Sequence, residues 1–139
     1  MACQAHLGEV QKRWDDFVAT GAAVLAVAHS SLQVLREYLK TRSWSFEVVT
    51  DPDRAAYSRL ELGRAAVWDY FRPKVLAGYL RAVSQGWRVR RPYGGEDLHQ
   101  LGGDFVLDRQ HRLRFAWRSA DPTDRPSAEQ LLEAIRTAV

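Results

Sequence analysis

The chain has 139 residues, of which 46% are hydrophobic and 27% charged, and its 20 basic and 17 acidic side chains give a net charge of +3. These values are typical of one globular domain, and they exclude a disordered tail, a collagen-like fibre and a disulfide-rich mini-protein. The longest apolar run, residues 22–28, is far shorter than the roughly twenty residues of a membrane span. No apolar stretch follows a basic start, so we expect no secretory signal, no membrane contact and a cytoplasmic location.

The hydrophobic pattern predicts alternating helices and strands. The expected elements are, in chain order, a helix over 4–20, a strand over 22–29, a helix over 31–42, a strand over 46–50, a short helix to about Leu62, a helix over 73–85, a loop over 87–103, a hairpin of strands 104–108 and 113–117, and a helix over 128–138. Gly21 and Gly86 are expected to end helices. Ser30 and Ser31 are expected to cap the helix over 31–42, and Ser127 the last helix.

The order of these elements predicts the fold class. Strand 22–29, helix 31–42 and strand 46–50 form a βαβ unit, which should be parallel and right-handed. A parallel unit followed by a hairpin and a last helix indicates an α/β three-layer sandwich with a mixed β-sheet, as a single domain over residues 1–139. Unusually, the chain opens with a helix and offers no strand ahead of it.

Two surface features could bind partners. Arg88, Arg90 and Arg91 form the only dense basic patch, which we interpret as a solvated loop rather than a nucleic-acid site. The aromatic segment 68–71, Trp-Asp-Tyr-Phe, lies in the least regular region and is a candidate interface patch.

Cys3 is the only cysteine, which excludes an internal disulfide and a cysteine-rich zinc site. Cys3 could be a buried side chain that only fills space in the core, a residue without a role at a frayed chain terminus, or a reactive thiol. A place at the start of the first helix would suit the third role, because free N–H groups and the helix dipole stabilise a thiolate, whereas a frayed chain terminus would suit the second. A peroxide would oxidise that thiolate to a sulfenic acid. Since no second thiol is present, reduction would need an external small thiol, another protein or a Cys3–Cys3 disulfide between chains.

Other polar residues are weaker candidates. His6 is interpreted as a surface residue or a tuner of the nearby thiol, because two ligands do not make a metal site. His29 ends a strand at the edge where open α/β sheets bind ligands, although a structural role suits it better. Asp121, Asp124 and Arg125 are expected to cap the last helix and to pair with one another. No cofactor or metal is therefore expected.

Three stretches carry an ordered set of motifs, at 3–31, 46–63 and 100–126. The second contains Asp-Pro-Asp-Arg, and the third contains Gln-Leu-Gly-Gly-Asp-Phe-Val-Leu-Asp and ends in an Asp-x-x-Asp-Arg-Pro element. Together they resemble the peroxiredoxin-like AhpC/TSA branch of the thioredoxin superfamily.

The resemblance implies a thioredoxin-like fold in which a central strand leads into a thiol motif, often C-x-x-C. Cys3 aligns with the second cysteine, and the first would precede Met1, so our hypothesis is an N-terminally truncated member of the family. The missing strand would lie between 22–29 and 104–108. These two strands must then pair directly, or a partner chain must fill the gap. The proline that thioredoxins place before the facing strand is absent, because Gly102 and Gly103 stand there.

The resemblance also implies an antioxidant oxidoreductase that reduces hydroperoxides or disulfides through Cys3, with an external thiol as reductant. A homodimer is compatible with this activity, whereas no nucleic-acid partner is expected. The alternative is a catalytically inactive thioredoxin-fold module that serves binding or assembly. Thiol titration and peroxide consumption distinguish the two.

Overall fold

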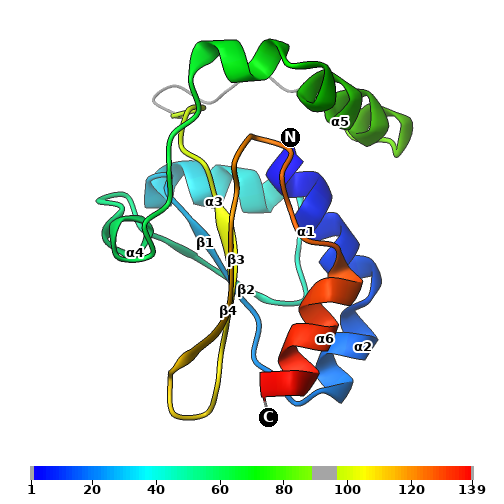
Figure 1. Ribbon diagram of the computed structural model, residues 1–139, viewed down its shortest axis with the longest axis vertical. Coiled ribbons are helices and arrows are strands. Elements are labelled where there is room, and N and C mark those ends of the chain that lie inside the picture. The colour runs from blue at the N-terminus through cyan, green and yellow to red at the C-terminus, as the bar shows by residue number, and fades with distance from the viewer. Residues whose placement is uncertain (1, 89–96, 139) are drawn as a thin grey trace.

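The computed structural model describes residues 2–88 and 97–138 (Figure 1). Its elements are α1 (Ala2–Lys12), α2 (Trp14–Ala19), β1 (Leu25–Ala28), α3 (Leu32–Thr41), β2 (Glu47–Thr50), α4 (Ala55–Arg59), the 3₁₀ helix η1 (Val67–Phe71), α5 (Pro73–Ser84), β3 (Gly103–Leu107), β4 (Leu113–Arg118) and α6 (Ala128–Ala138). Figure 1 shows α1, α2 and α6 together on one side of the strands, α4 on the other, and η1 with α5 at the top.

The opening helix is divided, which corrects the expectation of one helix over 4–20. The backbone of Arg13 leaves the helical region, with φ −109° and ψ 24°, and separates α1 from α2. The change of direction lets Trp14 lie against Phe46, with ring centroids 5.8 Å apart, while Phe17 is buried beside it in the core. Gly21 ends the segment with φ +73°, as predicted.

The predicted helix signals are confirmed. Ser31 caps α3 by accepting a hydrogen bond from the Val34 N–H at 3.4 Å. At α6, the Ser127 hydroxyl accepts from the Gln130 N–H at 3.2 Å and the Gln130 side chain accepts from the Ser127 N–H at 2.8 Å, which is a complete capping box. Gly86 follows α5 with φ +90°.

The strands form two separate sheets instead of one mixed sheet. β1 pairs with β2 in parallel, with Leu25 opposite Glu47, and β3 pairs with β4 in antiparallel fashion, with Gly103 opposite Arg118. Both the βαβ unit and the hairpin are thereby confirmed. Direct pairing of β1 with β3 is not found, and over 2–88 and 97–138 no other strand joins the two sheets.

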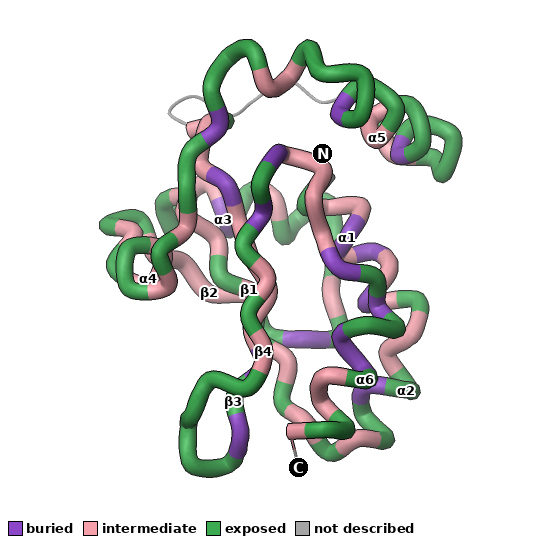
Figure 2. Tube along the Cα trace, in the orientation of Figure 1, coloured by how far each residue is buried: buried purple, intermediate pink, exposed green. Residues whose placement is uncertain are grey.

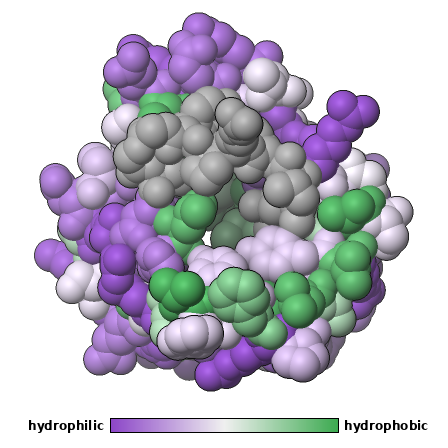
Figure 3. Space-filling view, turned by 90° about the horizontal axis from the view of Figure 1, so that it is seen from above, coloured by the Kyte–Doolittle hydropathy of each residue, from purple (hydrophilic) through white to green (hydrophobic). Residues whose placement is uncertain are grey.

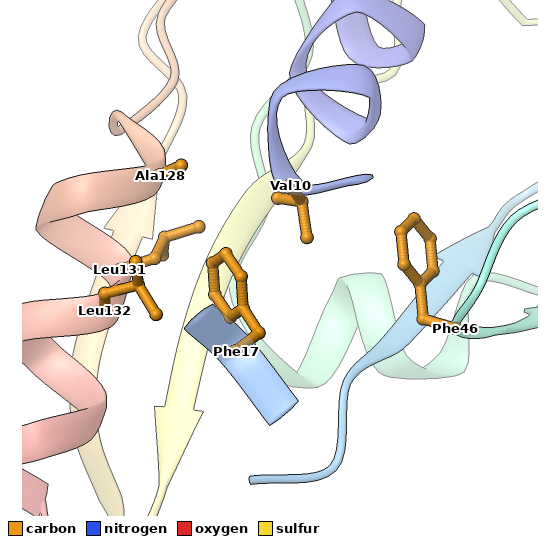
Figure 4. Packing of buried hydrophobic residues seen from close by; sticks show 6 residues of the cluster. All are labelled: Val10, Phe17, Phe46, Ala128, Leu131 and Leu132. Atoms are coloured by element: carbon orange, nitrogen blue, oxygen red, sulfur yellow. The ribbon is translucent and has the colours of Figure 1, made fainter. Parts of the chain in front are cut away.

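One hydrophobic core nevertheless serves both sheets. Figure 2 shows buried positions on α1, α2 and α6, whereas α4 carries none. The buried cluster, drawn in Figure 4, is Val10, Phe17, Phe46, Ala128, Leu131 and Leu132. Val24, Ala26 and Val48 pack against it from the β1–β2 side and Phe115 from the hairpin. The two sheets therefore share one layer of helices on one face.

The aromatic segment 68–71 lies at the surface, as the sequence suggested. Trp68 is 80% exposed and Phe71 66% exposed, and their ring centroids lie 6.4 Å apart. None of the helices in the described part of the chain has the length and hydrophobicity to cross a membrane.

Candidate functional site

Cys3 lies in the first turn of α1 and is exposed and free. In Figure 1 the start of α1 lies beside the loop that joins β4 to α6. Arg125 in that loop donates a hydrogen bond from Nη2 to the Cys3 Sγ at 3.1 Å. The contact joins two residues that lie 122 positions apart in the chain. It places a permanent cation directly beside the sulfur.

A carboxylate holds this cation in place. Arg125 Nη1 donates to Asp104 Oδ2 at 3.0 Å, and Asp104 Oδ1 lies 2.8 Å from His6 Nε2. An ionised carboxylate only accepts, so His6 donates from Nε2. His6 is 6% exposed, which corrects the expectation of a surface residue. A series of contacts therefore runs from His6 through Asp104 and Arg125 to Cys3.

Burial and charge compete at this cluster. Burial, the largest influence on Asp104, opposes its ionisation, but the hydrogen bond and charge of His6 and the charge of Arg125 outweigh burial and lower the pKa of Asp104. Burial likewise opposes the charge of Arg125, while Cys3 and Asp104 outweigh it and raise the pKa of Arg125. Both side chains are therefore ionised near neutral pH, and both are only 15% exposed.

Gly102 leaves the space that the guanidinium occupies. A Cβ atom at this position would clash with Arg125 Nη2. Gly102 thus accommodates Arg125 immediately before β3, the strand that carries Asp104. Across residues 2–88 and 97–138 there is no cis peptide bond.

Three tyrosines stand within electrostatic range of Cys3. Burial, followed by the charge of Cys3, raises the pKa of Tyr57 to about 12 and also raises the pKa of Tyr70. Burial, then Tyr70 and Cys3, raises the pKa of Tyr79 to about 12. All three hydroxyls stay protonated near neutral pH. Tyr57 donates to the Val27 carbonyl at 2.8 Å, and Tyr70 donates to the Leu98 carbonyl.

This geometry suits chemistry at sulfur. A guanidinium within hydrogen-bond distance stabilises a thiolate, and the thiolate is the reactive form of cysteine. The buried Asp104 in turn fixes the position and charge of Arg125. Sequence reasoning found Cys3 but missed Asp104 and Tyr57. Arg125 was singled out in the sequence only as part of the Asp-x-x-Asp-Arg-Pro element, which did not indicate its contact with Cys3.

The remaining candidates have structural roles or lie apart from the cysteine. His29 donates from Nε2 to the Asp97 backbone carbonyl, 3.0 Å away, and its ring meets the Tyr57 ring edge-on with centroids 5.7 Å apart. Asp121 pairs with Lys74 at 3.2 Å, not with Arg125.

The expectation that Asp121, Asp124 and Arg125 pair with one another is therefore wrong. The Asp124 carboxylate accepts from the Ala120 N–H at 2.8 Å, inside the loop before α6. Arg125 is drawn away from both aspartates because Asp104 and Cys3 are its partners.

Residues 89–96 lie outside the described part of the chain, and with them Arg90 and Arg91 of the basic patch. Within the described residues, no group of three or more His, Cys, Asp or Glu side chains could hold a metal ion.

Comparison with known proteins gives one clear result. The sequence model of the AhpC/TSA antioxidant enzymes matches residues 9–121, which is most of the chain. The matched range includes Asp104, while Cys3, His6 and Arg125 lie outside it. Searches among curated proteins and solved structures gave no match. The chain therefore has the α/β thioredoxin-like fold and belongs to the AhpC/TSA antioxidant enzyme family.

Proposed function

We propose that this protein is a thiol-dependent antioxidant oxidoreductase that reduces hydroperoxides or disulfides through Cys3. The observation that carries the proposal is the 3.1 Å contact between Arg125 Nη2 and the exposed Cys3 Sγ. Membership of an antioxidant enzyme family supports the same chemistry. Arg125 stabilises the attacking thiolate, and Asp104 with His6 positions Arg125.

The first step is a two-electron exchange between sulfur and peroxide. The Cys3 thiolate attacks one peroxide oxygen, so that an S–O bond forms and the O–O bond breaks. The sulfur is oxidised to a sulfenic acid and the peroxide is reduced to an alcohol or to water, with one proton taken up. As negative charge moves from the sulfur to the leaving oxygen, the Arg125 guanidinium can stabilise it at both atoms.

An external thiol completes the cycle. It condenses with the sulfenic acid to give a mixed disulfide and water, and a second thiol then releases Cys3 and leaves as a disulfide. A disulfide substrate would enter at the mixed-disulfide stage. The exposure of Cys3 supports an external reductant, because the sulfur is open to solvent. A cytoplasmic location belongs to the proposal, since that compartment keeps such thiols reduced.

The test follows hydrogen peroxide consumption with dithiothreitol as reductant. Wild-type protein is expected to consume peroxide catalytically, and Cys3→Ser to lose this turnover. Arg125→Gln should lower the rate at least about tenfold, because a charge-assisted hydrogen bond to the thiolate is lost. Dimedone labelling followed by mass spectrometry should find the sulfenic acid on Cys3.

Arg136→Gln is the matched control, since this arginine is exposed on α6 and its ion pairs are with Glu129 and Glu133 of the same helix. Its rate should equal that of wild type. Turnover that persists in Cys3→Ser, or a wild-type protein that reacts with peroxide no faster than free cysteine, would contradict the proposal. The second result would favour the binding or assembly module.

A further inference from the structure

The segment that joins α3 to β2 forms the wall of a cavity of about 260 Å³. Gln11 of α1 fixes this segment, because its side chain accepts from the Ser45 N–H at 2.8 Å and donates to the Ser45 hydroxyl at 2.7 Å. The described residues that line the cavity are Leu39, Arg42, Ser43, Trp44, Phe46 and Val48. Pockets for drug-sized ligands measure roughly 300–1,000 Å³, so this cavity suits a smaller molecule.

Most of the cavity wall is apolar. The Trp44 and Phe46 rings stack, with centroids 5.4 Å apart and an angle of 22° between their planes. Phe46 also belongs to the hydrophobic core, which fixes one end of this aromatic pair (Figure 4). Leu39 adds an aliphatic side chain that is 37% exposed. An apolar molecule in the cavity would therefore remove aromatic and aliphatic surface from water, which favours its binding.

Arg42 is the one charged side chain among the described residues that line the cavity. Side chains alternate between the two faces of an extended chain, and Phe46 and Val48 line the cavity, so Glu47 is directed to the opposite face. The carbonyl end of α3 would repel an anion, but it carries only about half of an elementary charge, whereas the guanidinium that follows it carries a full one. The cavity therefore combines apolar walls with a net positive charge.

Two indole rings hold Arg42 in place. Its guanidinium carbon lies 4.3 Å from the centroid of the Trp87 ring and 5.6 Å from that of Trp44. Trp87 in turn lies against α1 at Gly8, where a Cβ atom would clash with the ring. Within residues 2–88 and 97–138, no ion pair includes Arg42, and its partners are these rings. A guanidinium that stacks on a ring keeps its N–H donors in its own plane, where they remain available to a carboxylate.

We infer that this cavity binds a small carboxylate with an apolar body, whose carboxylate group accepts hydrogen bonds from Arg42 and whose apolar part lies against Trp44 and Phe46. Arginine matches a carboxylate with two parallel N–H donors, and the contact strengthens where apolar side chains exclude water. A neutral molecule of the same shape would leave the guanidinium without an anion, and an amine would be repelled. None of the lining residues belongs to the charge cluster around Cys3, so the inference stands apart from the proposed redox function.

A second apolar surface must be distinguished from this cavity in any binding experiment. It lies on η1 and α5, where Leu80 is 70% exposed beside the exposed aromatic segment 68–71. Figure 3 looks down on this end of the molecule and shows hydrophobic residues beside hydrophilic ones. An amphipathic molecule could adhere there without any contact with Arg42, so the test includes a variant of this surface.

Isothermal titration calorimetry with octanoate, octanol and octylamine, all below micelle-forming concentrations, tests the inference. Wild-type protein should bind octanoate saturably at one site, and octanol and octylamine at least about tenfold more weakly. Arg42→Gln should bind octanoate at least about tenfold more weakly than wild type does, with its affinity for octanol unchanged. Arg36→Gln is the matched control, because this arginine is exposed on the same helix and does not line the cavity. It should bind octanoate as wild type does.

Three further variants locate the bound molecule. Leu39→Gln places a polar group in the cavity wall and should weaken octanoate and octanol alike, by at least about threefold, and its partial exposure lets the protein fold. Leu80→Gln should bind octanoate as wild type does, and so should Cys3→Ser. The inference is overturned by the absence of saturable binding, by equal affinities of wild type for octanoate and octanol, by unchanged binding in Arg42→Gln or Leu39→Gln, or by a loss in Leu80→Gln.

Discussion

Replacing Asp104 by asparagine tests the buried charge cluster most directly. The substitution keeps the shape of the side chain but removes its charge, while Arg125 remains with 15% exposure and His6 with 6%. Two charge-assisted hydrogen bonds weaken, of 3.0 Å to Arg125 and 2.8 Å to His6. Of the two partners of the guanidinium, only the Cys3 sulfur then remains unchanged.

The expected loss of unfolding free energy is about 3 kcal/mol at pH 7. Hydrogen bonds to charged groups contribute roughly 1.5–3 kcal/mol each, and removal of one partner from a buried ion pair costs about 3–5 kcal/mol. The residual exposure of Asp104 and the neutral hydrogen bonds that asparagine can still make argue for the lower end of that range. A domain of this size is stable by only about 5–15 kcal/mol, so the loss should be plain.

Urea unfolding at several pH values measures this loss. The pKa of Asp104 is lowered in the folded protein, so the carboxylate contributes its full stabilisation above its unfolded pKa of about 3.9. That stabilisation is lost as the pH falls through the lower, folded pKa. The difference between wild type and Asp104→Asn should therefore be constant from about pH 7 to pH 5 and shrink below about pH 4.

Asp16→Asn serves as the matched control. Asp16 also pairs with an arginine, at 2.8 Å, but its side chain is 51% exposed. Its loss should stay below about 1 kcal/mol, as for other surface ion pairs. A loss at Asp104 no larger than this, or one of equal size at pH 7 and pH 3, would refute the electrostatic account of the cluster.

Three further substitutions test the core, the thiol contact and the tyrosines. Leu132→Ala should lower the unfolding free energy by about 2–5 kcal/mol in urea, because the side chain is fully buried. Gly102→Ala should displace the Arg125 guanidinium and slow alkylation of Cys3 by iodoacetamide several-fold near pH 7, and it should also lower the unfolding free energy because the buried pair with Asp104 is disturbed. Above about pH 10, wild-type stability should fall as unfolded tyrosine ionises first, and Tyr57→Phe should reduce this fall in urea titrations at pH 9–11.

Most of the fold could be predicted because its signals are local. The caps at Ser31 and Ser127, the stop at Gly21 and the polar turn of the hairpin each act within a few residues. The break at Arg13 could not be predicted, because the apolar spacing continues through it. The residue that follows the break, Trp14, packs against Phe46 just ahead of β2, a contact distant in sequence that local propensity does not contain.

The site was predicted less completely, for a physical reason. Cys3 is recognisable alone, since the start of a helix favours a thiolate whatever lies nearby. Its partner Arg125 is 122 positions away, and Asp104 is 98 positions from His6. Periodicity cannot reveal which of twenty basic residues will meet the sulfur. The arginine was expected to pair with aspartates close in sequence, and burial beside Asp104 decided otherwise.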